Sequence, residues 1–307
     1  MEGAEMVAIN TDSQDLSYTN ADRKILIGRE ITEGRGTGND PEKGRRAAEE
    51  NREQIKEMLV GADLTFITCG LGGGTGSGAG PVVADLAKRM GSLVVGVLTL
   101  PFGIEDDRTE MNAEVGLKNF RKYSNSTILI PGSRLLEMVP DLSIEEVFRI
   151  ADRLLADTIK RITEILSKPG LINLDFGNIK AILDDGGVAM VGFGESDSED
   201  RAREAVEEAL DNRLLEADLS DVDEALVSII GGPDTSIAET ETVAETVSKA
   251  LNPGAEVMLG AQINKNLEKK LKVMIIAPRV ETPWSEGSKE RKKREEVEDA
   301  LKDLKGL

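Results

Sequence analysis

The chain has 307 residues, enough for two domains of ordinary size, and its 38 Lys and Arg against 57 Asp and Glu give a formal net charge of −19. This acidity argues against a protein that coats DNA or an anionic membrane. Histidine is absent and Cys69 is the one cysteine, which excludes a Ser-His-Asp triad, a His-ligated metal and an internal disulfide. Because no apolar run approaches the roughly 20 residues of a membrane span, we expect a cytoplasmic protein.

Short apolar runs alternate with helical patterns through the first half of the chain. Strands are predicted over residues 6–12, 24–28, 63–69, 92–102 and 126–131, and helices over 41–59, 81–91 and 105–122. Asp40 is a suitable N-cap for the first of these helices, with Pro41 in its first turn. Continuously apolar strands separated by helices are typical of a parallel sheet in an α/β domain.

A long helix is predicted to begin at Ser143, which forms the S-x-x-E pattern of a capping box with Glu146. Apolar residues recur at three- and four-residue spacing as far as Leu166, and the helix ends at 168–170, Lys-Pro-Gly. Strands are then expected at 187–195, 224–232, 255–263 and 272–279, with helices near 198–210 and 238–250. This order predicts a second, smaller α/β domain beyond a central helix.

The segment from Cys69 to Val83 reads CGLGGGTGSGAGPVV, with seven glycines between a predicted strand and a predicted helix. Glycine removes the side chain, so several backbone N–H groups can converge on one ligand. A helix N-terminus adds unpaired donors and a positive partial charge. The segment therefore predicts an anion site, most often a phosphate site, because one or two glycines would suffice for a tight turn.

Two common phosphate motifs fit this segment poorly. A P-loop needs Gly-Lys-Ser/Thr, and no lysine occurs between Thr75 and Lys88. A dinucleotide fingerprint fits only at Gly74, Gly76 and Ala79, without the acidic residue expected about 20 positions later. A nicotinamide-dependent oxidoreductase is therefore a distant alternative.

The run GGGTGSG at 72–78 resembles the signature of the tubulin and FtsZ superfamily. Five further blocks agree in order and spacing: AINTDSQDL (8–16), GRGTGNDPEKGRRAAEE (34–50), FRIAD (148–152), PGLINLDFGNIK (169–180) and IIGGPDTSIAE (229–239). The resemblance covers roughly residues 6–280 and is closer to archaeal and bacterial FtsZ than to eukaryotic tubulin. It implies a protein that binds GTP and stacks head to tail into protofilaments.

The resemblance also implies roles for individual residues. The phosphates would be cradled by Gly72, Gly73, Gly74, Thr75, Gly76, Ser77 and Gly78. The surrounding loops would contribute Asn10, Asp12, Gly36, Gly38 and Asn39, and Glu105 would approach the ribose. Phe148 and Asp152, one helical turn apart, would stack on the guanine and hydrogen-bond to it. Phe148 taken alone is equally consistent with a core aromatic residue.

The block NLDFGN at 173–178 resembles the loop that, in this family, enters the nucleotide site of the next subunit and positions the attacking water. Asn173 and Asp175 match the family, whereas Asn178 stands where aspartate is usual. An amide can hold a water but cannot accept a proton at neutral pH. We therefore expect slow hydrolysis that depends mainly on Asp175. The alternative is that Asp175 and Asn178 form a polar turn that starts the next helix.

The match to the family is incomplete at three places. The chain begins at the family's second strand, so the first strand, a glycine loop and a helix are missing and we expect a gap in the sheet. The family's arginine near the ribose and phosphate aligns with Thr109, and the adjacent Arg108 is the candidate to replace it. Ser133 stands where the family has a carboxylate.

The expected organisation is an α/β fold in which a parallel-sheet GTP-binding domain is joined by a long helix to a second, smaller α/β domain. The boundaries are 1–142 for the GTP-binding domain, 143–168 for the central helix, 169–280 for the activation loop and C-terminal domain, and 281–307 for a charged tail. GTP or GDP is the expected nucleotide, with Mg²⁺ held largely by its phosphates and no assigned protein ligand.

The leading hypothesis is a GTP-hydrolysing cytoskeletal protein that acts in cell division or cell shape. Its expected partner is a second copy of itself, and further candidates are another FtsZ chain and a membrane-anchor protein, with no nucleic acid. One alternative is a scaffold that binds nucleotide and hardly turns it over. Another is a degenerate regulator that co-assembles with an intact FtsZ. The tail is interpreted as solvated, with a partner-binding helix near 297–304 as the alternative.

Overall fold

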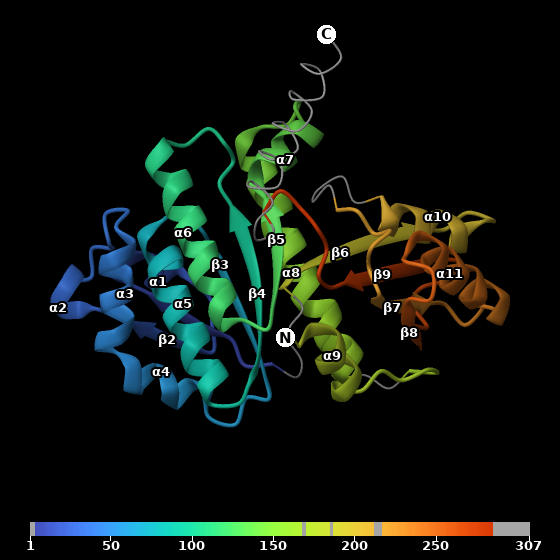
Figure 1. Ribbon diagram of the computed structural model, residues 1–307, viewed down its shortest axis with the longest axis horizontal. Coiled ribbons are helices and arrows are strands. Elements are labelled where there is room, and N and C mark those ends of the chain that lie inside the picture. The colour runs from blue at the N-terminus through green and yellow to red at the C-terminus, as the bar shows by residue number, and fades with distance from the viewer. Residues whose placement is uncertain (1–3, 168–169, 185–186, 212–216, 285–307) are drawn as a thin grey trace, which may run out of the picture.

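The structure is a computed structural model that describes residues 4–167, 170–184, 187–211 and 217–284. Its centre is a seven-stranded sheet of order β3-β4-β5-β6-β9-β7-β8. A separate two-stranded sheet, β1-β2, lies beside the first helices. The long helix α8 runs between the two halves of the molecule (Figure 1). The predicted α/β class, with a long helix between two strand-containing parts, is confirmed.

The first half of the chain alternates strands and helices as predicted, and its strands pair in parallel. The strands are β1 (Val7–Asn10), β2 (Arg23–Leu26), β3 (Leu64–Gly70), β4 (Leu93–Leu100) and β5 (Ser126–Pro131). The helices are α1 (Ser13–Tyr18), α2 (Arg29–Thr32), α3 (Pro41–Glu50), α4 (Arg52–Leu59), α5 (Gly74–Arg89), α6 (Asp107–Tyr123) and α7 (Gly132–Met138). Among the described residues, β1 and β2 pair only with each other and not with the seven-stranded sheet.

The second half begins with α8 (Ile144–Ser167), whose start carries the predicted capping box between Ser143 and Glu146. The following elements are α9 (Phe176–Leu183), β6 (Gly187–Ser196), α10 (Arg201–Leu210), β7 (Glu224–Gly231), α11 (Ile237–Ala250), β8 (Glu256–Ile263) and β9 (Leu271–Ala277). β6 pairs with β5 in parallel, so the sheet continues from one half into the other. β9 is antiparallel to β6 and β7, which makes this part of the sheet mixed.

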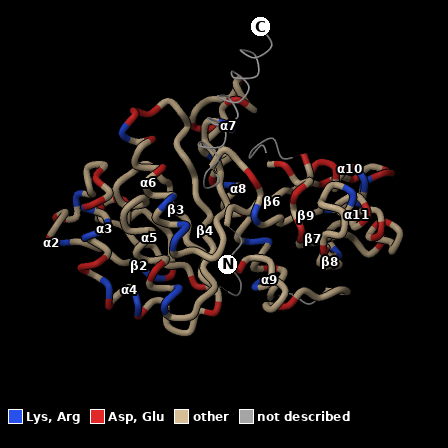
Figure 2. Tube along the Cα trace, in the orientation of Figure 1, with Lys and Arg blue, Asp and Glu red and all other residues tan. Residues whose placement is uncertain are grey.

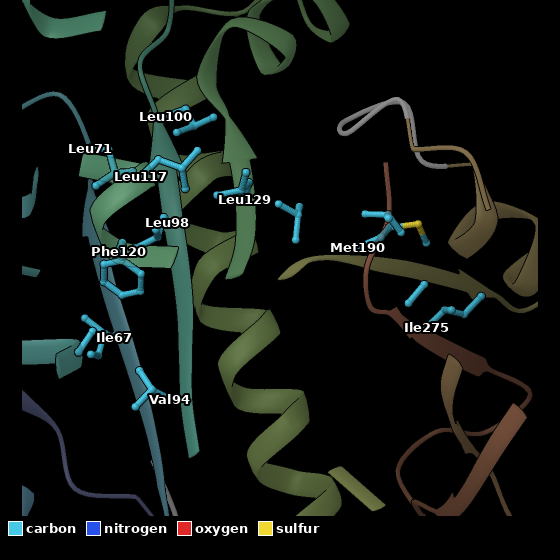
Figure 3. Close-up of a cluster of buried hydrophobic side chains, with 14 of the residues drawn as sticks. Ile67, Leu71, Val94, Leu98, Leu100, Leu117, Phe120, Leu129, Met190 and Ile275 are labelled. Atoms are coloured by element: carbon cyan, nitrogen blue, oxygen red, sulfur yellow. The ribbon is translucent and has the colours of Figure 1, made fainter. Parts of the chain in front are cut away.

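The core lies on both faces of the sheet, because successive side chains of a strand point to opposite faces. On one face, Val94 and Leu98 of β4 pack in the same cluster as Phe120 of α6. On the other face, Val95 and Val97 share a cluster with α8 and α9. Figure 3 shows Leu98, Leu100, Leu117, Phe120 and Leu129 gathered around β4, with Met190 and Ile275 on the β6–β9 side.

Two of the predicted helices have different bounds in the structure, and α1, α2 and α7 are helices that the sequence analysis did not predict. The helix expected over 41–59 is divided into α3 and α4 at Asn51, whose backbone leaves the helical region and whose side chain accepts a hydrogen bond from Gly28 N over 2.8 Å. The helix expected to begin at residue 81 begins at Gly74 instead, and Pro81 lies inside it. Asp40 does cap α3, with Pro41 in the first turn, as predicted.

Charged residues of both signs are interspersed over both halves of the molecule (Figure 2). None of the helices within the described ranges is long and apolar enough to cross a membrane. The tail beyond residue 284, interpreted as solvated with a helix near 297–304 as the alternative, lies outside the described residues.

Candidate functional site

The glycine-rich segment forms the junction between β3 and α5. Gly73 is the N-cap of α5, and residues 74–78, which the sequence predicts to be a loop, form its first turns. No side chain of the described residues caps this helix. The first N–H groups of a helix have no intrahelical acceptor, so α5 presents free donors at the carboxyl edge of the parallel strands.

Close packing of backbones explains why this junction is so rich in glycine. A Cβ atom on Gly74 would collide with Thr37 Oγ1 and lie 2.7 Å from Asp40 N. A Cβ atom on Gly78 would collide with the carbonyl of Pro41. The N-terminal ends of α3 and α5 therefore touch, and a side chain at either glycine would separate them.

The two hydroxyl groups of the segment have different surroundings. Ser77 Oγ accepts a hydrogen bond from Gly72 N over 2.8 Å, and Ser77 is only 3% exposed. This buried hydroxyl therefore stabilises the backbone of the junction. Thr75 Oγ1 lies 2.7 Å from Thr11 Oγ1, a contact that joins the junction to the end of β1. Thr11 was not singled out by the sequence because one threonine among polar residues carries no pattern.

The loops that follow β1 and β2 lie beside this junction. Asn10 Oδ1 accepts hydrogen bonds from the backbone of Thr11 and Asp12, and Asp12 caps α1. Gly36 N donates to Thr11 O over 3.1 Å, which brings the second loop next to the first.

The second loop continues to the start of α3 through Gly38 and Asn39, which both have positive φ. Asn39 Nδ2 donates to Thr109 Oγ1 of α6 over 3.2 Å. The loop is thereby joined to α6 as well as to β1. The structure thus brings together the predicted residues Asn10, Asp12, Gly36, Gly38 and Asn39.

The start of α6 lies against the same group of loops. Glu105 accepts hydrogen bonds from the backbone N–H groups of Phe102 and Ile104, so its carboxylate holds the turn that precedes α6. Asp106 caps α6, and the hydroxyl and N–H of Thr109 donate to it, which lowers the pKa of Asp106. Arg108 is exposed on the first turn of α6.

Phe148 and Asp152 lie one turn apart within the first three turns of α8 and are both exposed on one face of it. Phe148 is 46% exposed, so it is not a core residue. Its ring packs on the buried ring of Phe102, with centroids 4.4 Å apart and an angle of 59° between the planes. Phe102 therefore supports Phe148 and leaves part of its ring accessible.

The loop at 173–178 lies apart from the glycine-rich junction and Phe148. Asn173 Oδ1 accepts from Gly170 N over 2.7 Å, and Asp175 and Asn178 form a capping box at the start of α9. The polar turn that starts a helix, given above as the alternative for these two residues, is thus observed. Figure 1 shows α7 and α9 at opposite ends of α8, so this loop and Phe148 are remote from each other within one chain.

A hollow of about 430 Å³ lies between α3, α5 and α6 and is lined by residues such as Arg45, Val82 and Tyr123. It touches Ser77 and Gly78 but not Phe148 or Asp152. Within the part of the chain that the structure describes, no three Asp, Glu or Cys side chains are grouped to hold a metal ion.

Known proteins are similar to this chain in sequence and in fold. The family described as "Tubulin/FtsZ family, GTPase domain" matches residues 2–140, and "FtsZ family, C-terminal domain" matches 187–281. "Cell division protein FtsZ 1" of Pyrococcus horikoshii is 51% identical over 274 residues, which are 89% of this chain and 73% of that protein. The same-named protein of Thermococcus kodakarensis is 47% identical over 290 residues, 94% of this chain and 78% of its own length.

A solved structure described as an empty FtsZ dimer of M. jannaschii superimposes with a TM-score of 0.85. It is 44% identical, and the match covers 90% of this chain and 81% of that one. The order of elements, the two family domains and these relatives show that the chain belongs to the Tubulin/FtsZ family and carries the family's GTPase domain followed by its FtsZ C-terminal domain.

Proposed function

We propose that this protein binds GTP at the carboxyl edge of its parallel strands, polymerises head to tail into protofilaments and hydrolyses GTP slowly at the contacts between subunits. We further propose that it acts in cell division, which the names of its relatives support, or in cell shape. The nucleotide would lie in the GTPase domain, and the loop at 173–178 that acts on it would come from the next subunit.

Binding of GTP is supported by the N-terminal ends of α3 and α5 and by the exposed residues of α8. The adjoining N-terminal ends of α3 and α5 offer backbone donors and positive partial charge to phosphates. The exposed part of the Phe148 ring suits stacking on a base. The carboxylate of Asp152, one turn further on, suits the adjacent N–H donors of guanine.

The separation along α8 carries the rest of the proposal. Phe148 lies in the first turns of α8 and the loop at 173–178 follows its end, so the 19 residues from Phe148 to Ser167 correspond to roughly 28 Å of helix. Asp175 therefore cannot reach a nucleotide held by Phe148 in its own chain. A second copy placed end to end would bring its Asp175 to that nucleotide.

Exposed apolar residues at two separate places support end-to-end contact. Near the start of α8, Met138, Leu142 and Ile144 are exposed. Beyond the other end of α8, Leu171 is 75% exposed, and Ile237 at the start of α11 is 79% exposed. Two different surfaces that pair between copies form a heterologous contact, which builds filaments when its rotation does not close a ring.

Hydrolysis of the γ-phosphate depends on an oriented water and on neutralised charge. The carboxylate of Asp175 can accept a hydrogen bond from that water, while the amide of Asn178 can hold it but not take its proton. Mg²⁺ bound with the nucleotide would supply charge neutralisation, held largely by phosphate oxygens. This division of roles is the reason that we propose slow turnover.

The test is complementation between two inactive variants. D175N lacks the carboxylate but keeps its nucleotide residues, and F148A/D152A lacks the base contacts but keeps its loop. Neither should hydrolyse GTP well alone. In an equal mixture, about a quarter of the contacts would pair an intact nucleotide site with an intact loop, so the mixture should recover up to about a quarter of the wild-type rate if the site is shared between chains.

The matched control is a mixture of wild type with a triple variant, D175N/F148A/D152A. This mixture contains the same substitutions in the same amounts, but all of its intact site residues belong to the wild-type chain. If the site is shared between chains, about a quarter of its contacts are also complete. Equal activity in the two mixtures supports the shared site. Activity in the control mixture alone would show that each site is completed within one chain.

A further inference from the structure

Asn112 of α6 is bonded to both loops of the proposed phosphate site, although it belongs to neither. Its Nδ2 donates to Asn39 O over 3.1 Å and to Gly72 O over 3.1 Å. Asn39 precedes α3 and Gly72 precedes α5, so one side-chain amide joins two segments that are far apart in the sequence. Nothing in the motifs around the glycine-rich segment singles out this residue.

The two bonded carbonyls belong to the peptide groups that begin α3 and α5. In a trans peptide the C=O and N–H bonds point in opposite directions. With Asn39 O and Gly72 O turned toward Asn112, the N–H groups of Asp40 and Gly73 point away from it. Asp40 and Gly73 are the N-caps of α3 and α5, so Asn112 sets the direction of both N-cap amides.

Neighbouring contacts hold the start of α6 against both loops. Thr109, one turn earlier on α6, accepts a hydrogen bond from Asn39 Nδ2 and donates one to Asp106 Oδ1. Gly72 has φ of 111°, and a Cβ atom there would lie 2.7 Å from Thr109 Cγ2. The first turns of α6 thus pack directly on both loops and leave them little room to turn.

We propose that Asn112 is a positioning residue of the phosphate site, which fixes the N-cap amides of α3 and α5 so that they face the phosphates of the bound nucleotide. Asn112 itself touches neither phosphate nor guanine. The inference rests on the proposed function, in which these loops bind GTP. It predicts that loss of Asn112 weakens the binding of ligands that carry phosphates and leaves recognition of the base unchanged.

The test compares the affinities of GTP, GDP and guanosine for the whole chain, with guanosine measured by its competition against GTP. N112A removes both bonds without adding charge, and N112D keeps the shape of the side chain but replaces the donor by an acceptor. N119A is the matched control, because Asn119 lies two turns later on α6 and contacts Lys122 instead of the loops. Circular dichroism confirms that each variant is folded.

We expect N112A and N112D to weaken GTP and GDP binding by about 10-fold to 100-fold, the loss expected for two hydrogen bonds that orient donors. Guanosine affinity should stay within about twofold, and N119A should match the wild type for all three ligands. Unchanged GTP affinity in N112A would overturn the inference, as would an equal loss for guanosine, which would indicate general loosening. A wild type that binds none of the three would contradict the proposed function itself.

Discussion

Asp175 and Asn178 cap each other at the start of α9. Asn178 N donates to Asp175 Oδ1 over 2.9 Å, and Asp175 N donates to Asn178 Oδ1 over 3.0 Å. Capping explains why these polar residues are needed for the helix, and it uses only one oxygen of the Asp175 carboxylate. The loop can therefore have a structural role within its own chain and present Oδ2 of Asp175 to a neighbouring subunit.

N178D should raise GTP turnover several-fold. The new carboxylate can still accept the hydrogen bond from Asp175 N, so the capping box is retained, and it adds a group that can accept a proton from water. The measurement is phosphate release per subunit at saturating GTP. If turnover does not rise although GTP binding and polymerisation are intact, the amide at this position is not what limits hydrolysis.

Two substitutions of Asp175 separate its structural role from its chemical one. Asparagine caps helices about as well as aspartate, so D175N should keep the stability of the wild type and lose turnover by roughly 10²-fold to 10⁴-fold. D175A should lose turnover equally and also about 1 kcal/mol of stability. Urea unfolding beside a phosphate-release assay measures both, and a D175N variant with wild-type turnover would contradict the role given to the carboxylate.

F148A should weaken GTP binding by roughly 5-fold to 150-fold, because stacking of a base on an aromatic ring contributes about 1–3 kcal/mol. The chain should stay folded, since Phe148 is exposed and the buried Phe102 beneath it remains. D152A should reduce the preference for GTP over ATP. V60A is the control, an exposed apolar change at the end of α4, and an equal loss of affinity there would show that the effect is not local.

Glu195 provides a prediction on pH because it lies between Lys270 and Lys272 and forms ion pairs with both. Hydrogen bonds from these lysines, Lys270 first, lower the pKa of Glu195 to about 2 from its usual 4.5. A carboxyl group with a lowered pKa in the folded state stabilises the fold at pH above 4.5. This stabilisation is lost as the pH falls toward 2 and the folded protein also takes up the proton.

The difference in unfolding free energy between wild type and E195Q should therefore be constant at pH values above about 5 and shrink as the pH falls toward 2. The side chain of Glu195 is 37% exposed, so solvent screening limits the difference to about 1 kcal/mol or less. Urea unfolding at a series of pH values measures it. A difference that is the same at pH 3 and pH 7 would show that the ion pairs do not set it.

The sequence predicted most of the fold because its signals are local. Continuous apolar strands, the Ser143–Glu146 capping box and the Asp40 N-cap each depend on neighbouring residues, and all are observed. The division of α3 from α4 could not be predicted in this way. It depends on a hydrogen bond between Asn51 and Gly28, which are 23 positions apart.

Prediction of the site from the sequence has the same limit, because only local patterns can be read from it. The pairing of Phe148 with Asp152 follows from helical spacing, and the structure places both on one exposed face. The two hydrogen bonds of Asn112 arise only when α6 packs on Gly72 and Asn39, which lie 40 and 73 positions earlier, so no local pattern reveals them. Likewise, Gly74 and Gly78 were interpreted as phosphate ligands, and their packing against α3 becomes visible only in three dimensions.

The central claim is that the junction of β3 and α5 and the exposed pair Phe148 and Asp152 together bind guanine nucleotide. The most direct measurement is a titration of this 307-residue chain with GTP, with GDP and ATP for comparison. The account predicts micromolar binding of GTP and GDP and much weaker binding of ATP. A folded chain that binds none of the three, or binds ATP as well as GTP, would contradict it.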